Sequence, residues 1–208
     1  MSQYLALPKL PLIAILRGLP PADAASTGAL LYDIGYRVIE VPLNRPGALE
    51  SLAILKKTLP SDALLGAGTV LEPEQVRQAA DLGCQLIVSP DCNPEVIRAT
   101  VAAGLWSLPG VSSPTEAFVA LRSGAHGLKA FPAEAILPPV IHAWRSVLPT
   151  EVPLIPVGGI TRLGMADHVH AGASGFGIDS TLYSPDRSVD ELTKRARAFV
   201  DAWHQIEH

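Results

Sequence analysis

One lysine of this chain lies inside an apolar run, in Gly127-Leu128-Lys129-Ala130-Phe131-Pro132. The other lysines lie in a terminal arm or among polar, helix-like neighbours, where water solvates them: Lys9, Lys56, Lys57 and Lys194. Burial disfavours the ammonium form of a lysine and lowers its pKa. A neutral amine near pH 7 is a nucleophile that forms Schiff bases with carbonyl compounds. Lys129 therefore predicts imine chemistry.

A carboxylate in a second apolar run could move the protons that this chemistry needs. Side chains alternate along a strand, so in Val38-Ile39-Glu40-Val41-Pro42 the glutamate shares a face with Val38 and Pro42. The same alternation places Lys129 and Phe131 on one face, and Leu128 and Ala130 on the other. We predict Lys129 as the nucleophile and Glu40 as the general acid and base. The alternative is a structural ion pair, because buried charges need partners, although aliphatic side chains would fill a core better.

The composition limits the classes of protein to consider. With 48% hydrophobic and 17% charged residues, the 208 residues can bury one large core, so we expect a single domain over residues 1–208. A net charge of -4 without a cluster of basic residues argues against a nucleic-acid partner. Since no apolar run is long enough to cross a membrane and the N-terminus lacks the pattern of a signal peptide, we expect a cytoplasmic protein with no membrane partner.

Metal ligands are sparse. Cys84 and Cys92 do not form a Cys-x-x-Cys motif, and the imidazoles of His168 and His170 would point roughly 200° apart on a helix. We therefore predict neither a metal site nor a cofactor.

Eight strand-like runs alternate with helix-like stretches, which is typical of a parallel sheet. The expected strands are Leu10–Arg17, Arg37–Leu43, Ala63–Val70, Leu86–Pro90, Trp106–Gly110, Gly127–Pro132, Pro153–Gly159 and Gly175–Ser180. Helix boundaries are marked by prolines and glycines, and Ser113-Pro114-Thr115-Glu116 has the spacing of a capping box. Eight such pairs predict an α/β fold, a small (β/α)8 TIM barrel. A doubly wound sheet is the alternative, but no Gly-x-Gly-x-x-Gly turn follows the first strand.

In barrel enzymes the active site lies at the carboxyl ends of the strands. Arg17 ends the first strand and Thr69 the third, and a guanidinium and a hydroxyl suit a substrate carboxylate. A surface ion pair for Arg17 and a helix cap for Thr69 are the alternatives. After strands seven and eight, Gly158-Gly159 and Asp179-Ser180 lie where barrels commonly bind phosphate. Simple turns would also explain the glycines.

These motifs together resemble one known family. They are Leu16-Arg17-Gly18, Val38 to Asn44, Gly66-Ala67-Gly68-Thr69-Val70, Gly127 to Ala133 and Val157-Gly158-Gly159-Ile160. The chain resembles, over nearly its whole length, the 2-keto-3-deoxy-6-phosphogluconate/phosphogalactonate aldolases, class I aldolases on a small barrel. The resemblance implies cleavage of a phosphorylated 2-keto-3-deoxy sugar acid to pyruvate and D-glyceraldehyde 3-phosphate, in a homotrimer.

The resemblance also implies a role for each matching residue. Lys129 would form the Schiff base at C2, and Glu40 would take the C4 hydroxyl proton. The others would bind substrate: Arg17 and Thr69 at the pyruvate end, Gly158, Gly159 and the Asp179-Ser180 backbone at the phosphate, and Phe131 as an apolar wall.

Two positions bear on the choice of sugar acid. Gluconate-type enzymes typically carry threonine at the position of Val157 and arginine at that of Asn44, whereas the set of Arg17, Asn44 and Val157 resembles the phosphogalactonate type. The gluconate epimer and 4-hydroxy-2-oxoglutarate are the nearest alternative substrates. More distant alternatives are a barrel isomerase or decarboxylase of sugar phosphates and a non-catalytic sugar-phosphate binding protein.

Asp179 departs from the family pattern, which commonly has glycine at its position. A carboxylate that pointed at the phosphate would repel it, whereas one that turned away would leave the backbone amide free to bind.

Overall fold

The computed structural model describes residues 4–206, and parallel strands alternate with helices along all of them. The strands are β1 (Leu12–Ile15), β2 (Val38–Pro42), β3 (Leu64–Gly68), β4 (Leu86–Val88), β5 (Trp106–Leu108), β6 (Gly110–Val111), β7 (Leu128–Ala130), β8 (Leu154–Pro156) and β9 (Phe176–Ile178). The α-helices are α1 (Pro21–Ile34), α2 (Ala48–Thr58), α3 (Pro73–Asp81), α4 (Pro94–Ala102), α5 (Pro114–Arg122), α6 (Pro138–Arg145), α7 (Met165–His170) and α8 (Val189–His204), with a 3-10 turn, η1 (Arg162–Gly164), before α7.

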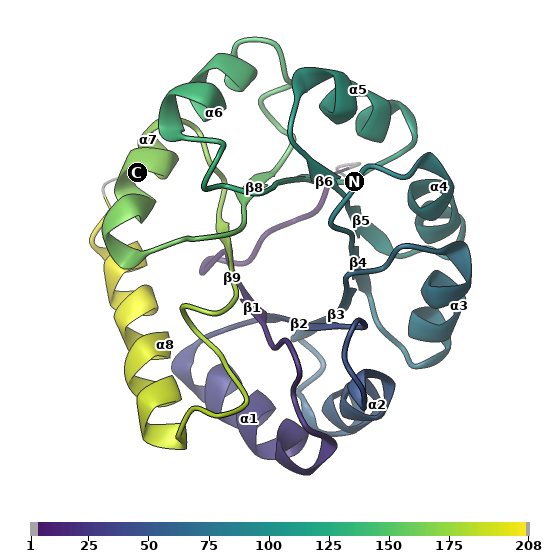
Figure 1. The fold of residues 1–208 in the computed structure, drawn as a ribbon, viewed down its shortest axis with the longest axis vertical. Coiled ribbons are helices and arrows are strands. Elements are labelled where there is room, and N and C mark those ends of the chain that lie inside the picture. Colours follow the sequence, from purple (N-terminus) through teal and green to yellow (C-terminus); the bar gives the residue numbers. More distant parts are fainter. Residues whose placement is uncertain (1–3, 207–208) are drawn as a thin grey trace.

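The strands close into the predicted barrel (Figure 1). One set of parallel pairings runs β5-β4-β3-β2-β1-β9 and a second runs β6-β7-β8. The sets join where Val157 pairs with Gly177, and β5 and β6 are two pieces of the fifth barrel strand on either side of Pro109. Proline has no N–H to donate to a ladder, which explains the interruption. The prediction of a (β/α)8 barrel is confirmed, with strands shorter than the expected runs.

The helices form an outer ring, and most of them begin as the sequence predicts. Pro21, Pro73 and Pro114 each occupy the first position of a helix, where the missing N–H is not needed. The capping box expected at Ser113 forms only in part. The Ser113 hydroxyl accepts from the N–H of Glu116, but the Glu116 carboxylate accepts from Ser112 instead of from the N–H of Ser113.

Alternate strand residues divide the apolar core into two layers. Ile39 and Val41 pack outward among helix residues, as Leu128 and Ala130 do on the other side of the barrel. The interior layer consists of Leu5, Ile13, Ile15, Val38, Leu86, Val88, Leu108, Ile155 and Val157, with Phe131 packed against it. The expected orientation of strands β2 and β7 is therefore confirmed.

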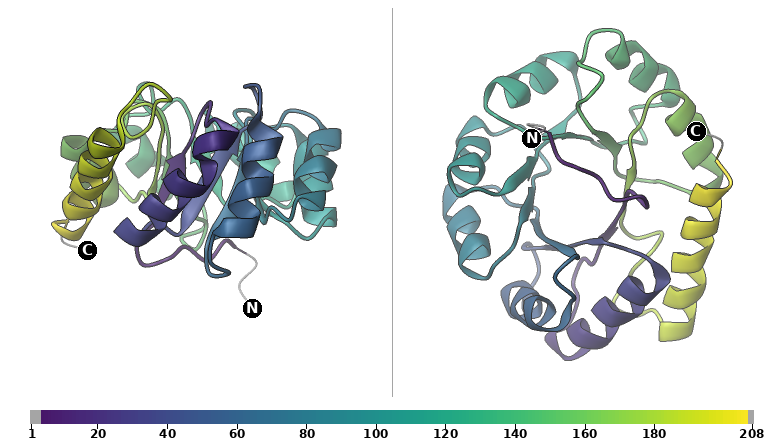
Figure 2. Two further views of the ribbon diagram at one scale, coloured as in Figure 1. Left: turned by 90° about the horizontal axis from the view of Figure 1, so that it is seen from below. Right: turned by 180° about the vertical axis from the view of Figure 1, so that it is seen from behind.

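An N-terminal arm closes one end of this interior, crossing the barrel in the view from behind (Figure 2). Leu5 joins the interior layer, and its N–H donates to the carbonyl of His126, just before β7, at 2.9 Å. The arm thus covers the end where the strands begin. The polar side chains must be reached from the opposite end, where the strands finish.

Within residues 4–206, no helix is both long and apolar enough to cross a membrane.

Candidate active site

Lys129 lies in the middle of β7 and is 5% exposed. Its backbone is held by neighbouring strands on both sides, opposite Gly110 and Ile155. Its Nζ lies 4.6 Å from the centre of the Phe131 ring. Burial lowers the pKa of the Lys129 ammonium and the Arg17 cation lowers it further, while Glu40 and Asp179 oppose the shift. The neutral, nucleophilic form of this amine is therefore easier to reach than that of a lysine in water.

Glu40 lies on β2 and is 2% exposed. Its Oε2 atom is buried and has no hydrogen-bond partner among the residues that the structure describes. Burial raises the pKa of this carboxyl to about 7, although the Lys129 and Arg17 cations act in the opposite direction. A carboxyl with a pKa near neutrality can both accept and donate a proton, which is what a general acid and base must do.

A glycine on the neighbouring strand makes room for this carboxyl. A Cβ atom at Gly68, at the end of β3, would lie 1.4 Å from Oε2 of Glu40. Any other residue at position 68 would therefore displace the carboxyl. This contact explains the glycine at the end of the Gly66-Ala67-Gly68 motif.

Arg17, just beyond β1, donates hydrogen bonds to three other side chains. Its Nε and Nη2 donate to Oδ2 of Asp179 at 3.1 and 2.7 Å, and its Nη1 donates to Oδ1 of Asn44 at 3.1 Å and to Oγ1 of Thr69 at 3.4 Å. The structure therefore brings together four residues that the sequence singled out. It also answers the question about Asp179, whose carboxylate turns toward a cation.

Thr69 has a strained backbone conformation. Its φ angle is +52°, in the left-handed region that residues with a β-branched side chain rarely adopt. Strained residues of this kind gather at functional sites, where the surroundings hold them in place. The hydroxyl is thereby directed at Arg17.

Gly158 and Gly159 follow β8 with φ angles of +103° and +62°, which glycine adopts readily. One contact here has no counterpart in the sequence prediction. A Cβ atom on either glycine would lie within 2.6 Å of the side chain of Glu134, so this carboxylate rests against the pair. Only its position shortly after Lys129 could have drawn attention to Glu134.

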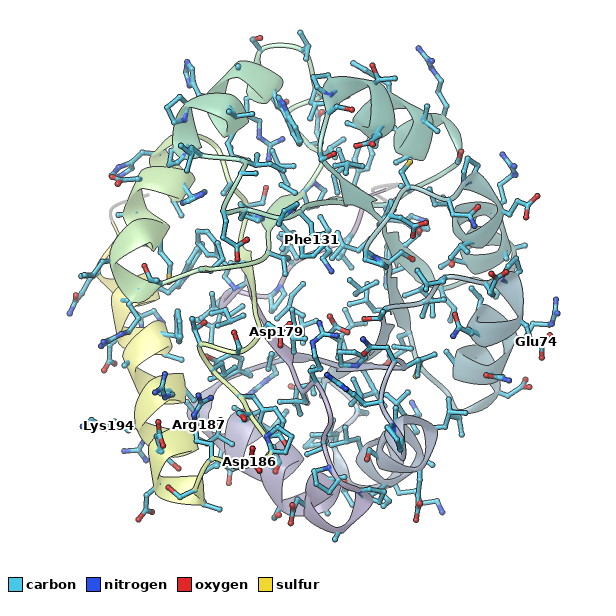
Figure 3. All side chains as sticks on the ribbon, in the orientation of Figure 1. Glu74, Phe131, Asp179, Asp186, Arg187 and Lys194 are labelled. Carbon is cyan, nitrogen blue, oxygen red and sulfur yellow. The ribbon has the colours of Figure 1, made fainter. Side chains whose placement is uncertain are left out.

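The remaining predicted residues surround the same mouth of the barrel. Val157 is buried in the interior layer, and Phe131 and Asp179 project into the centre of the ring (Figure 3). Ser180 follows β9 and lines a cleft of about 400 Å³ together with Arg17, Arg45 and Asp179. The loops after β8 and β9 are tied together, because the Thr181 hydroxyl donates to the carbonyl of Ile160 at 3.0 Å.

The donor set does not suit a metal ion. Within the described part of the chain, no group of three or more His, Cys, Asp or Glu side chains is placed to hold one. The reactive groups in the interior of the barrel are the amine of Lys129 and the carboxyl of Glu40.

A buried amine and a buried carboxyl of near-neutral pKa inside one (β/α)8 barrel are groups that could form an imine with a carbonyl substrate and transfer its protons. Residues 5–193 match the family model described as KDPG and KHG aldolase. The chain belongs to this aldolase family, and it is a carbon–carbon lyase.

Individual relatives agree with this assignment. The chain is 44% identical over 197 residues to 2-dehydro-3-deoxy-6-phosphogalactonate aldolase of Escherichia coli (strain K12), covering 95% of this chain and 96% of the relative. It is 36% identical to 2-dehydro-3-deoxy-phosphogluconate aldolase of Treponema pallidum (strain Nichols), over 71% of this chain and 70% of the relative. The solved structure described as native KDPGal superimposes with a TM-score of 0.94 at 43% identity, covering 96% of this chain and 97% of that one.

Proposed function

We propose that this chain is a class I aldolase that cleaves 2-dehydro-3-deoxy-6-phospho-D-galactonate to pyruvate and D-glyceraldehyde 3-phosphate. The observation that carries the proposal is the burial of Lys129 and Glu40 inside one barrel, with Oε2 of Glu40 left without a partner. An unpartnered buried carboxylate oxygen costs free energy, so the site is built for a group that arrives with the substrate.

The reaction begins with addition of the neutral Lys129 amine to the C2 carbonyl, giving a carbinolamine. Loss of its hydroxyl as water, with one proton delivered by Glu40 as the general acid, leaves a protonated imine. Burial supports this step because it lowers the pKa of Lys129.

The imine then accepts the electron pair of the C3–C4 bond. The Glu40 carboxylate takes the C4 hydroxyl proton, the bond breaks, and the aldehyde product leaves an enamine on Lys129. Protonation of the enamine at C3 and hydrolysis of the resulting imine release pyruvate and regenerate the amine. No metal is needed, because the iminium nitrogen is the electron sink.

The remaining residues bind the two ends of the substrate. We assign the carboxylate to Arg17 and Thr69, where it would take over contacts that Nη1 of Arg17 now makes to Asn44 and Thr69. We assign the phosphate to the backbone N–H groups of Gly158, Gly159 and the Asp179-Ser180 segment. Phe131 forms the apolar wall beside the imine, and Val157 faces the sugar carbons.

Trapping of the imine tests this proposal directly. Incubation with pyruvate and borohydride is expected to add one reduced pyruvyl group to the peptide that contains Lys129, as measured by mass spectrometry. The matched control is Lys129→Met, which should remain unmodified. An unmodified Lys129 in the wild-type protein would refute the assignment, and turnover of a sugar phosphate without a trapped imine would favour an isomerase or decarboxylase.

The choice between epimers is tested by the cleavage rates of the two purified substrates. The phosphogalactonate substrate is expected to have the higher kcat/KM, since Val157 and Asn44 match the galactonate type and the relative from Escherichia coli carries that name. Faster cleavage of the gluconate epimer or of 4-hydroxy-2-oxoglutarate would transfer the proposal to that substrate.

We also propose that the chain forms a homotrimer, as the family resemblance implies. Two leucines near the barrel mouth support self-association. Leu163 in η1 is 94% exposed, and Leu137, just before α6, is 56% exposed. Light scattering coupled to size-exclusion chromatography is expected to give the mass of three chains, and a monomer at micromolar concentration would contradict this.

A further inference from the structure

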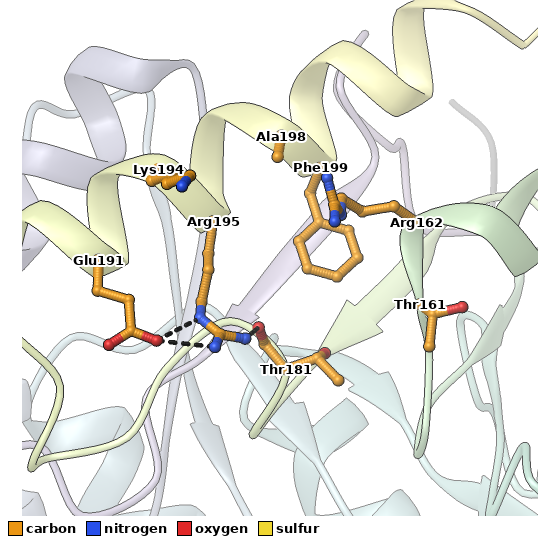
Figure 4. Close-up of a pocket in the computed structure, with 8 residues that line it drawn as sticks. All are labelled: Thr161, Arg162, Thr181, Glu191, Lys194, Arg195, Ala198 and Phe199. Carbon is orange, nitrogen blue, oxygen red and sulfur yellow. Dashed lines mark hydrogen bonds and ion pairs between the residues drawn. The ribbon is translucent and has the colours of Figure 1, made fainter.

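A groove on the outside of the barrel, between η1 and α8, is lined by basic side chains that the aldolase chemistry does not use (Figure 4). Its volume is about 560 Å³, which is within the range of small-molecule sites. The lining residues are Thr161, Arg162, Thr181, Glu191, Lys194, Arg195, Ala198 and Phe199. Ala198 and Phe199 give the groove an apolar side.

The charges in the groove are not balanced. Its single carboxylate, Glu191, accepts from Arg195 at 2.7 Å and also pairs with Arg187 at 3.4 Å. The side chains of Arg162 and Lys194 make no hydrogen bond or ion pair with any residue of the described chain. The lining of the groove therefore includes two exposed cations without a counterion among the described residues, which is an arrangement that attracts an anion.

The groove lies directly behind the loops assigned to the substrate phosphate. Nη1 of Arg195 donates to the carbonyl of Thr181 at 3.1 Å, and the Thr181 hydroxyl donates to the carbonyl of Ile160 at 3.0 Å. Ile160 directly follows Gly158-Gly159, and Thr181 directly follows Asp179-Ser180. Two hydrogen bonds thus connect the wall of the groove with both phosphate loops.

We propose that this groove is a second anion site, separate from the catalytic one, which binds an organic phosphate of nucleotide size. Arg162 and Lys194 bind the phosphate, and the apolar side at Ala198 and Phe199 receives the rest of the molecule. Because Arg195 joins the groove to the loops, a bound ligand changes how tightly the loops hold the substrate phosphate. This last consequence rests on the proposed function, whereas binding itself does not.

Calorimetry with AMP as the probe tests the site without requiring turnover. The wild-type chain is expected to bind one AMP per chain with a dissociation constant below 1 mM, and adenosine, which lacks the charge, at least tenfold more weakly. The double variant R162A/K194A should lose at least tenfold in AMP affinity. The matched control K57A/R98A removes two exposed cations far from the groove and should bind as the wild type does.

Several results would overturn the site. The first is the absence of AMP binding. The second is an AMP affinity that R162A/K194A leaves unchanged, which would place the nucleotide at the catalytic phosphate loops. The third is an equal loss of AMP affinity in K57A/R98A, which would indicate attraction by net charge. Thermal melts show whether R162A/K194A is folded, and the charge reversal Lys194→Glu repeats the test with one exposed residue.

Enzyme kinetics test the connection to the loops. Saturating AMP is expected to change the KM for the phosphorylated substrate at least twofold in the wild type and not in R162A/K194A. An unchanged KM despite bound AMP would contradict the connection. An enzyme that binds AMP but cleaves no sugar acid would count against the proposed function and leave the site standing.

Discussion

The carboxylate of Asp179 holds the guanidinium of Arg17 through a single oxygen, Oδ2, which accepts from Nε and Nη2 at 3.1 and 2.7 Å. The two residues are 162 positions apart, and they meet because β9 closes the barrel beside β1. The pair fixes one side of the guanidinium, so that Nη1 faces Asn44 and Thr69. The Asp179 carboxylate thus positions the guanidinium of Arg17.

Replacing Asp179 by asparagine should weaken this positioning. Asp179→Asn keeps the shape of the side chain but replaces a charged acceptor with a neutral one, and charge-assisted hydrogen bonds are roughly twice as strong as neutral ones. The KM for the sugar acid is expected to rise about tenfold while kcat changes little, because Arg17 is assigned to binding. Steady-state kinetics check this. Asp186→Asn, on the exposed part of the same loop, is the control, and equal kinetics in the two variants would contradict the role.

Glu40 should give the reaction a pH dependence near neutrality. Its carboxylate form is the base, and its pKa is raised to about 7 by burial. In the wild type kcat/KM is expected to increase as the pH rises through about 7. Glu40→Gln should lose this limb and about 100- to 10,000-fold in kcat. Glu95→Gln, at an exposed glutamate, is the control and should keep the wild-type profile; a profile unchanged in Glu40→Gln would exclude Glu40 as the base.

The same pKa shift should affect stability. The unfolded chain releases the Glu40 proton near pH 4.5, whereas the folded protein keeps it until about pH 7. Folding is therefore favoured by the protonated form, and its contribution is complete below pH 4.5 and lost as the pH rises to 7. Relative to Glu40→Gln, the wild type should lose at most roughly 3 kcal/mol of unfolding free energy over this interval. Urea titrations at several pH values measure it, and a constant difference between the two proteins would contradict the shift.

Much of the site follows from short-range patterns. Strand alternation correctly predicted that Glu40 and Lys129 face inward while Ile39 and Leu128 face the helices. The order of strands and helices predicted the barrel, and hence which strand ends meet. These features depend on periods of two and on chain order, both of which are written in the sequence.

Other features depend on the course of loops in space, which no local pattern determines. The hydrogen bonds between Arg17 and Asp179 could be predicted only if the residue at which β9 ends were known. The contact of Glu134 with Gly158 could be predicted only if the path of the loop after β7 were known. The capping box at Ser113 formed only in part because the neighbouring Ser112 offered its N–H and hydroxyl to the same carboxylate. Such competition between adjacent donors is decided by geometry and not by spacing.

Gly68 should be coupled energetically to Glu40. A Cβ at this position would lie 1.4 Å from Oε2, so Gly68→Ala is expected to displace the carboxyl, to destabilise the protein by about 1–3 kcal/mol and to lower kcat sharply. In a Glu40→Ala background the added methyl group has room, and the destabilisation should largely disappear. A double-mutant cycle in urea measures the coupling. Gly164→Ala, whose Cβ would make only an ordinary contact at 3.5 Å, is the control, and additive effects of Gly68→Ala and Glu40→Ala would contradict the steric account.

Val157 should contribute to the preference between epimers. Its side chain is buried at the mouth of the barrel and packs toward Gly177, so a hydroxyl introduced there could reach only the substrate or the protein core. In Val157→Thr the ratio of kcat/KM for the galactonate substrate to that for the gluconate substrate is expected to fall about tenfold, since a single hydrogen bond to a hydroxyl discriminates by about that much. Val88→Thr introduces the same change at a buried valine of the interior layer and should leave the ratio within about twofold. An equal shift of the ratio in both variants would mean that any polar group in the interior layer alters the preference. An unchanged ratio in both variants would mean that other positions, such as Asn44, determine the preference.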